Sequence, residues 1–221
     1  MTERDWSDEP PEQRQESVLV PGEPAPAVEP QPPAAPEEEG VAAPQSPAGN
    51  GRAPAEHSDG DFVIPAGYGV LEGAPNGTRR SVGIVVSRFN GGVTTRLLEA
   101  ALAELEEAGV TREAITVMPV PGAFELPLAA MALAKTRRYA CIVALGCVIR
   151  GDTPHFDLVA GEAASGLQLA ALETGVPVSF GVLTLEEPAQ ADDRLAKGAE
   201  AARTGLEMAD VFSQLRAAAS R

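Results

Sequence analysis

The segment from Gly151 to His155 carries the groups best suited to chemistry in this sequence. Thr153 followed by Pro154 predicts the start of a helix, because Thr is a good N-cap and Pro is favoured at the first helical position. The free N–H groups at such a start bind anions, and the imidazole of His155 can exchange protons near neutral pH. An isolated segment of this kind is more often a helix cap beside a surface histidine, so the other segments decide between the two interpretations.

Other predicted strands are followed by, or contain, aromatic, acidic and basic side chains. Phe89 precedes two glycines and could stack on a flat heterocycle, although a lone phenylalanine is by default a core residue. Glu125 could accept hydrogen bonds from the hydroxyls of a polyol, or could complement the dipole of a helix start. Phe180 lies inside a predicted strand and is a core residue unless that strand lies at a subunit edge. Arg194 and Lys197, near the last helix, are either solvated surface charges or ligands of an anion.

Alternating apolar runs and helical repeats predict the elements that position these residues. Strands are predicted at residues 81–87, 114–120, 139–149 and 176–183, and helices at about 97–108, 124–136, 153–175 and 195–209. Four strand–helix units predict an α/β fold, a three-layer sandwich in which helices cover both faces of a four-stranded parallel sheet. Ligands of such sheets bind outside the carboxyl ends of the strands. The site then suits a phosphate-bearing small molecule with a flat polar ring, and one histidine for proton transfer.

The composition divides the 221-residue chain into unequal parts. Residues 1–75 contain 14 of the 20 prolines and 3 Arg against 15 Asp and Glu, which is −12 of the net charge of −15. We predict that residues 1–60 are a disordered, acidic, Pro-rich tail, because they have little apolar surface to offset the entropy of ordering. Residues 61–80 are interpreted as a linker with one candidate short strand, Phe62-Val63-Ile64. Residues 81–221 are interpreted as one globular domain.

Several function classes are excluded by what the sequence lacks. There is no basic patch, so we expect no nucleic-acid partner, and no apolar run of about 18 residues, so we expect no membrane partner. No metal-ligand cluster and no dinucleotide or P-loop motif is present. Cys141 and Cys147 would lie roughly 20 Å apart on one extended run, too far for a disulfide. Without an apolar signal segment, two unpaired thiols predict a cytoplasmic protein.

Five segments in order carry a resemblance to a known family. They are VVSRFN (85–90), VPGAFELP (120–127), ALGCVIRGDTPHFD (144–157), FGVLT (180–184) and KGAEAA (197–202). On these segments the chain, over about residues 81–215, resembles the 6,7-dimethyl-8-ribityllumazine synthase (lumazine synthase) family. The histidine segment is long and highly specific.

The resemblance implies a flavodoxin-like fold and a cofactor-free transferase of riboflavin biosynthesis. The reaction would join 5-amino-6-(D-ribitylamino)uracil to 3,4-dihydroxy-2-butanone 4-phosphate. For the uracil substrate, the resemblance implies that Phe89 stacks on the ring, that Ala123, Phe124 and Glu125 bind the ribityl chain, and that Cys147, Val148 and Ile149 contact the pyrimidine edge. For the butanone phosphate, it implies that the phosphate is bound by Asp152, Thr153 and Arg194, with Lys197 nearby. It further implies that His155 is the acid/base and that Phe180 of a neighbouring subunit closes the site. The implied assembly is a pentamer or a multiple of it, up to a closed shell of about 60 subunits.

Two departures from the family pattern keep alternatives open. Only Leu195 and Ala196 separate Arg194 from Lys197, whereas the family has a longer loop there, and Leu158 stands where family members often have Tyr. The first alternative is an assembly-forming or flavin-binding paralogue with weak or no synthase activity. The second is a monomeric flavodoxin-like module that binds phosphate.

Overall fold

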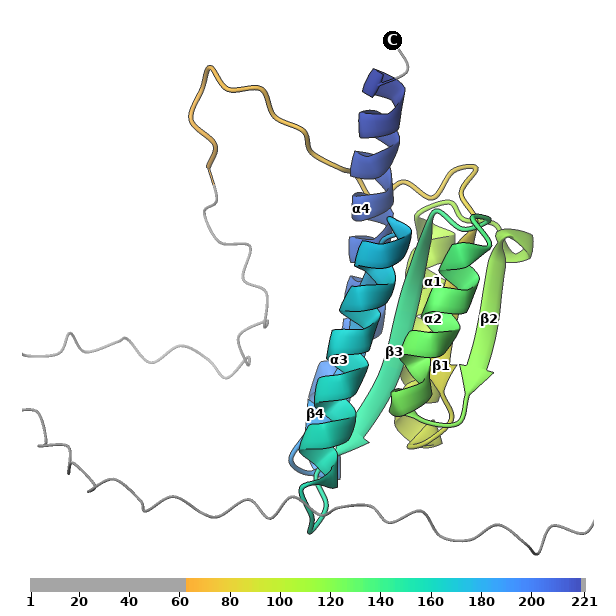
Figure 1. The fold of residues 1–221 in the computed structure, drawn as a ribbon, viewed down its shortest axis with the longest axis vertical. Coiled ribbons are helices and arrows are strands. Elements are labelled where there is room, and N and C mark those ends of the chain that lie inside the picture. The colour runs from red at the N-terminus through yellow and green to blue at the C-terminus, as the bar shows by residue number, and fades with distance from the viewer. Residues whose placement is uncertain (1–62, 220–221) are drawn as a thin grey trace, which may run out of the picture. The chain divides into compact units, whose positions relative to one another are not determined.

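A computed structural model of the chain describes residues 63–219, and its centre is a four-stranded sheet (Figure 1). All strands are parallel, and their order across the sheet is β2-β1-β3-β4. The strands are β1 (Val82–Ser87), β2 (Ile115–Val120), β3 (Cys141–Ile149) and β4 (Val178–Leu185). The predicted parallel α/β sheet is therefore confirmed.

Helices cover both faces of this sheet, as a three-layer sandwich requires. They are α1 (Gly91–Glu107), α2 (Leu126–Lys135), α3 (His155–Thr174) and α4 (Lys197–Ala219), with short 3₁₀ turns η1 (Arg112–Ala114), η2 (Ala123–Glu125) and η3 (Pro188–Arg194). Helices α1 and α4 pack together on one face, and α2 and α3 pack together on the other (Figure 1). Each face buries its own apolar cluster against the sheet.

The two central strands are apolar on both sides because both sides are covered. Ile84, Val143 and Leu145 face the α1/α4 layer, while Val85 and Ile142 face the α2/α3 layer. Side chains of a strand alternate between faces, so a strand between two helix layers reads as a continuous apolar run. This is the pattern that predicted β1 and β3 from the sequence.

One glycine allows each helix pair to pack closely. A Cβ at Gly198 of α4 would overlap the carbonyl oxygen of Leu97 in α1, and a Cβ at Gly166 of α3 would lie 2.7 Å from the Cβ of Pro127 in α2. Both contacts, to an oxygen at 2.2 Å and to a carbon at 2.7 Å, are closer than van der Waals contact allows. The absence of a side chain at these two positions therefore sets how near the paired helices lie.

Several predicted boundaries are wrong, the largest differences being that α1 begins at Gly91 instead of about residue 97 and α4 ends at Ala219 instead of about residue 209. Two smaller differences have a clear local cause. Strand β4 begins at Val178 instead of Val176, because Pro177 has no N–H to give to the sheet and only its carbonyl is used, by the N–H of Ile142 at 2.8 Å. Thr153 was expected to cap α3, but Pro154 holds the cap position with φ −62° and ψ 0°, and no side chain caps this end. Since Pro154 is already helical, Thr153 stands one residue too early to cap.

The predicted tail, residues 1–60, and Phe62 of the candidate strand lie outside the described residues. Val63 and Ile64 are described, and in this single chain they belong to no strand and are exposed. Further along, the backbone is anchored on α4, because Gln214 Nε2 donates to the carbonyl of Glu72 at 2.8 Å and the N–H of Ala74 donates to Asp210 at 3.2 Å. Packing on the domain thus starts before residue 81.

None of the helices in the described part of the chain is long and apolar enough to cross a membrane.

Candidate functional site

A cavity of about 670 Å³ lies at the carboxyl end of the sheet, where β1 and β3 separate. The chain leaves β1 toward β2 on one side, while β3 and β4 lie on the other, so this is the point at which the strand order reverses. Open α/β sheets bind their ligands at such a point. The predicted site residues that line the cavity are Phe89, Ala123, Phe124, Glu125, Cys147, Val148, Ile149, Thr153 and His155.

The end of β1 is held so that Phe89 stands at the mouth of the cavity. Pairing with the neighbouring chain segment continues past the strand, as Arg88 N–H donates to Val120 at 2.8 Å and Phe89 N–H donates to Pro121 at 3.0 Å. Asn90 adopts a left-handed conformation with φ 57°, and its Nδ2 donates to the carbonyl of Cys147 at 2.9 Å. Phe89 is 69% exposed, so its ring is positioned but not covered. A flat ligand ring could stack on it.

Glu125 is fixed by a hydrogen bond at the start of η2. Its Oε2 accepts from the backbone N–H of Gly122 at 2.9 Å, which closes the turn that precedes α2. Among the described residues Oε1 makes no hydrogen bond, so one carboxylate oxygen remains for a ligand hydroxyl. Both interpretations of Glu125, structural cap and hydroxyl acceptor, are therefore compatible in one side chain.

Cys147 contributes a neutral surface to the cavity. Burial raises the pKa of its thiol to about 11. The thiol therefore stays protonated near neutral pH, where the nucleophilic form would be the thiolate. Covalent catalysis by this cysteine is thus disfavoured.

His155 is the first residue of α3 and is exposed to the cavity. Leu158 and Val159, one turn further along α3, line the cavity beside it. Residues three and four apart share a face of a helix, so their spacing from His155 is the signal that could have found them. Phe156 also lines the cavity and was likewise missed by the sequence analysis.

Arg150 braces the segment that carries His155. Its Nε donates to Glu186 at 2.6 Å, its two terminal nitrogens donate to Asp157 at 3.2 Å each, and its guanidinium carbon lies 4.1 Å from the centre of the Phe156 ring. Hydrogen bonds to Asp157 and then to Glu186 raise the pKa of Arg150. This one side chain joins the end of β3, the first turn of α3 and the end of β4.

Four predicted site residues lie outside this cavity in the single chain: Asp152, Phe180, Arg194 and Lys197. Phe180 lies in the middle of the edge strand β4, not at its carboxyl end, and is 42% exposed. Arg194 donates to the carbonyl of Gln190 at 3.0 Å, and Lys197 pairs with Glu200 at 3.2 Å. Asp152 is exposed in the loop before α3.

Within residues 63–219, no group of three or more His, Cys, Asp or Glu is placed to hold a metal ion. The cavity instead combines an aromatic ring, a carboxylate, a hydroxyl and an imidazole. Fold and site together define a flavodoxin-like α/β protein with a cavity of small-molecule size at the switch point of its sheet.

Comparison with known proteins identifies the family. The family model described as 6,7-dimethyl-8-ribityllumazine synthase matches residues 79–213. The chain is 50% identical over 153 residues to the 6,7-dimethyl-8-ribityllumazine synthase of Edwardsiella ictaluri (strain 93-146), and 48% identical over 153 residues to that of Yersinia pestis (strain Pestoides F). Each match covers 66% of this chain and 98% of the relative. The chain belongs to the 6,7-dimethyl-8-ribityllumazine synthase family, a family of transferases in riboflavin biosynthesis.

Proposed function

We propose that the protein condenses 5-amino-6-(D-ribitylamino)uracil with 3,4-dihydroxy-2-butanone 4-phosphate to give 6,7-dimethyl-8-ribityllumazine, with release of water and phosphate. The observation that carries the proposal is that Phe89, Glu125, Thr153 and His155 line one cavity of about 670 Å³. These residues come from three different strand ends, and their chemistry matches a flat ring, a polyol, a phosphate and a proton transfer. The names of the relatives support the same reaction.

The uracil substrate is assigned to the half of the cavity between β1 and β3. Phe89 stacks on the pyrimidine ring, and Glu125 accepts hydrogen bonds from ribityl hydroxyls through its free oxygen. Phe124 is exposed at the same wall and covers the chain of the polyol. The remaining contacts in this half come from Ala123, Cys147, Val148 and Ile149.

The butanone phosphate is assigned to the loop before α3. Thr153 binds the phosphate through its hydroxyl, and Asp152 binds it within the same loop. Both residues lie beside a helix start, which favours negative charge. His155 then stands next to both substrates. The uracil amine attacks the ketone, and a first water leaves to form an imine. Phosphate is then eliminated, and attack of the ribitylamino nitrogen on the remaining carbonyl closes the ring with loss of a second water.

His155 moves protons in these steps. Placing two substrates in one cavity lowers the activation free energy by several kcal/mol. A general acid/base raises the rate about 10²–10⁴-fold. Burial raises the pKa of the Cys147 thiol to about 11, so this thiol stays protonated and the proposal gives the proton transfers to the imidazole of His155.

A second copy of the chain completes the site in this proposal. Phe180 is an exposed aromatic on an edge strand, and Leu172 and Leu128 are exposed apolar side chains on the neighbouring helices α3 and α2. Exposed apolar surface of this kind marks an interface. We therefore propose a homo-oligomer, a pentamer or a multiple of it, in which Phe180 closes the cavity of a neighbouring subunit. Light scattering that gave a monomer would contradict this.

One observation favours the alternative of a paralogue that assembles or binds a flavin without efficient synthesis. Arg194 and Lys197 do not line the cavity, and each is held by a neighbour, Gln190 or Glu200. The two-residue spacing between them shortens the loop that would bring positive charge to the phosphate. In this alternative the cavity binds the heterocyclic ring of its ligand, but the protein catalyses the condensation only slowly.

A direct assay separates the two. The purified protein is mixed with both substrates, and lumazine absorbance and phosphate release are followed together. Product above the spontaneous rate in both signals supports the synthase, whereas intact assembly with no such product supports the alternative.

The protein is also assigned to the cytoplasm. Cys141 and Cys147 are free and buried, which fits a reducing compartment. Fractionation of cells that express the chain, with detection of the protein outside the cytoplasmic fraction, would overturn this assignment.

A further inference from the structure

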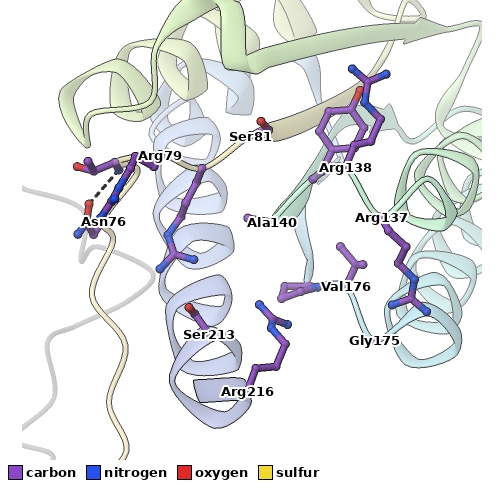
Figure 2. Close-up of a pocket in the computed structure, with 14 residues that line it drawn as sticks. Asn76, Arg79, Ser81, Arg137, Arg138, Ala140, Gly175, Val176, Ser213 and Arg216 are labelled. Atoms are coloured by element: carbon purple, nitrogen blue, oxygen red, sulfur yellow. Dashed lines mark hydrogen bonds between the residues drawn. The ribbon is translucent and has the colours of Figure 1, made fainter. Parts of the chain in front are cut away.

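A second cavity, of about 730 Å³, lies at the opposite end of the sheet from the His155 site. It is formed where the chain enters β1, β3 and β4, next to the last turns of α4 (Figure 2). Strand β3 spans nine residues, so the two cavities are separated by about 30 Å of sheet. This cavity therefore cannot share a small ligand with the His155 site.

Five arginines line this second cavity, and no aspartate or glutamate does: Arg79, Arg80, Arg137, Arg138 and Arg216. They come from three segments far apart in the sequence, the loop before β1, the turn before β3 and the end of α4 (Figure 2). A hollow lined by one sign of charge concentrates ions of the opposite sign. The hydroxyls of Thr78, Ser81, Tyr139 and Ser213 line the same cavity and add hydrogen-bond donors.

Most arginines of the described domain that lie outside the cavity are used in ion pairs, whereas three of the five in the cavity are not. Arg112, Arg150 and Arg203 each pair with a carboxylate. Within residues 63–219, the guanidinium groups of Arg79, Arg137 and Arg138 make no ion pair and no hydrogen bond, so their donors are available. Arg80 is the exception in the cavity, since it pairs with Asp210 at 2.6 Å.

Two of these arginines stand in backbone conformations that disfavour arginine. Arg79 has φ 60° and Arg137 has φ 59°. Residues other than Gly, Asn and Asp have a strained backbone in this left-handed region. Each residue lies in a turn for which Gly or Asn would be easier, so the turn does not explain the arginine. The third non-glycine residue with positive φ in the described range is Asn90, which positions Phe89 in the first cavity.

We propose that this arginine-lined cavity is a binding site for an oligophosphate, a small anion with several linked phosphate groups. Guanidinium groups bind phosphate oxygens in pairs of parallel hydrogen bonds, and three free guanidinium groups from two turns suit more than one phosphate. The ring of Tyr139 offers a surface for the organic part of a nucleotide, if the oligophosphate carries one.

The test is calorimetric titration of the full chain with inorganic tripolyphosphate at about 50 mM salt, where screening is weak. We expect saturable binding with one site per chain, at least about tenfold tighter than for orthophosphate, and weaker as salt is raised. The double variant Arg79→Asn/Arg137→Asn should lower the affinity at least about tenfold, since it removes two charged donors. Because Asn tolerates positive φ, this variant should melt no lower than the parent, so that unfolding cannot explain the loss.

Matched variants assign the site. Arg96→Gln/Arg112→Gln also removes two exposed guanidinium groups, but outside the cavity, and should leave the affinity unchanged. Thr153→Val, in the first cavity, should also leave it unchanged. Loss of binding in Thr153→Val with retention in Arg79→Asn/Arg137→Asn would overturn the proposal, as would the absence of saturable binding. Tight binding of polyglutamate without binding of tripolyphosphate would also overturn it and assign the cavity to an acidic peptide.

Discussion

His155 and Cys147 lie in the same cavity, and their environments give them different chemistry. Burial holds the pKa of the Cys147 thiol at about 11, so the sulfur remains protonated near neutral pH. His155 is exposed at the start of α3, where an imidazole can accept and return a proton. In the proposed reaction, His155 and not Cys147 is therefore the group that moves protons.

Replacing His155 with alanine should slow the reaction without abolishing substrate binding. We expect kcat to fall about 10²–10⁴-fold, the usual contribution of a general acid/base, with little change in KM. Steady-state absorbance of the lumazine product measures both. His57→Ala, at the only other histidine in the chain, is the matched control and should be silent. An unchanged kcat in His155→Ala would remove this residue from the mechanism.

Arg150 acts as a positioning residue, and Arg150→Lys should show it. Lysine keeps the charge but cannot bridge Asp157 and Glu186 with a rigid fork. The loop before His155 is then held less firmly, and we expect kcat to fall about tenfold, with the pH dependence of kcat retained because the imidazole is still present.

Arg112→Lys is the control for that variant. Arg112 also holds a carboxylate, Glu106, through two hydrogen bonds of 2.8 and 3.0 Å, but it lies outside the His155 cavity. Equal kcat values for Arg150→Lys and the parent, or a parallel loss in Arg112→Lys, would contradict a positioning role.

At the scale of elements, the contact between α1 and α4 depends on the missing side chain at Gly198. Gly198→Ala would drive a Cβ into the carbonyl of Leu97, and we expect a loss of about 1–3 kcal/mol in the free energy of unfolding. Gly161→Ala, in α3, is the matched control, because a Cβ there meets nothing within 4 Å. It should gain about 0.5–1 kcal/mol from helix propensity. Urea unfolding measures both, and equal effects would refute the packing argument.

The segment before β1 is attached to α4 through one carboxylate, and this attachment should depend on pH. Hydrogen bonds from Gln214 and from the N–H of Ala74, with the nearby charge of Arg80, lower the pKa of Asp210 below 3.8. A lowered folded pKa means that the stabilisation is present above pH 3.8 and is lost as the pH falls through the folded pKa.

Asp210→Asn tests this attachment. The variant should be less stable than the parent at pH 7, and the difference should shrink as the pH falls below about 4. Urea unfolding of both proteins across this range measures it. A stability difference that stays constant down to pH 3 would contradict the assigned role of the carboxylate.

At the scale of the whole molecule, both cysteines should be protected by the fold. Burial raises the pKa of Cys141 to about 12 and that of Cys147 to about 11, so neither forms a reactive thiolate near neutral pH. A chromogenic disulfide reagent should therefore titrate no thiol in the native protein and both thiols after denaturation. Rapid reaction of either thiol in the native state would contradict the described burial.

The two ends of the sheet carry different chemistry, and the sequence predicts the site at the carboxyl end better than the cavity at the opposite end. The His155 site uses residues that directly follow strands, such as Phe89 and Glu125, so strand order and local spacing were enough to place them. The arginine-lined cavity draws on the loop before β1, the turn before β3 and the end of α4. No local pattern links these segments, so the sequence shows no basic patch.

Arg150 shows the same limit within the site itself. Its partner Glu186 is 36 residues away, so the pair exists only because β3 and β4 are neighbours in the sheet. Phe180 and Arg194 show the reverse case, since family resemblance assigns them to the site while the single chain keeps them outside the cavity. For Phe180, we propose that the packing of a second copy brings the ring to the cavity of a neighbouring subunit.

The sequence by itself determined the class of fold, the strand ends that carry chemistry and the family, because apolar periodicity and short motifs are local properties. Only the tertiary structure decided which side chains share a cavity, which carboxylates are already used, and which arginines remain free. These outcomes depend on contacts between residues far apart in the chain, and sheet order and helix packing set those contacts. The same folding that gathers Phe89, Glu125 and His155 at one end therefore also gathers the arginines at the other.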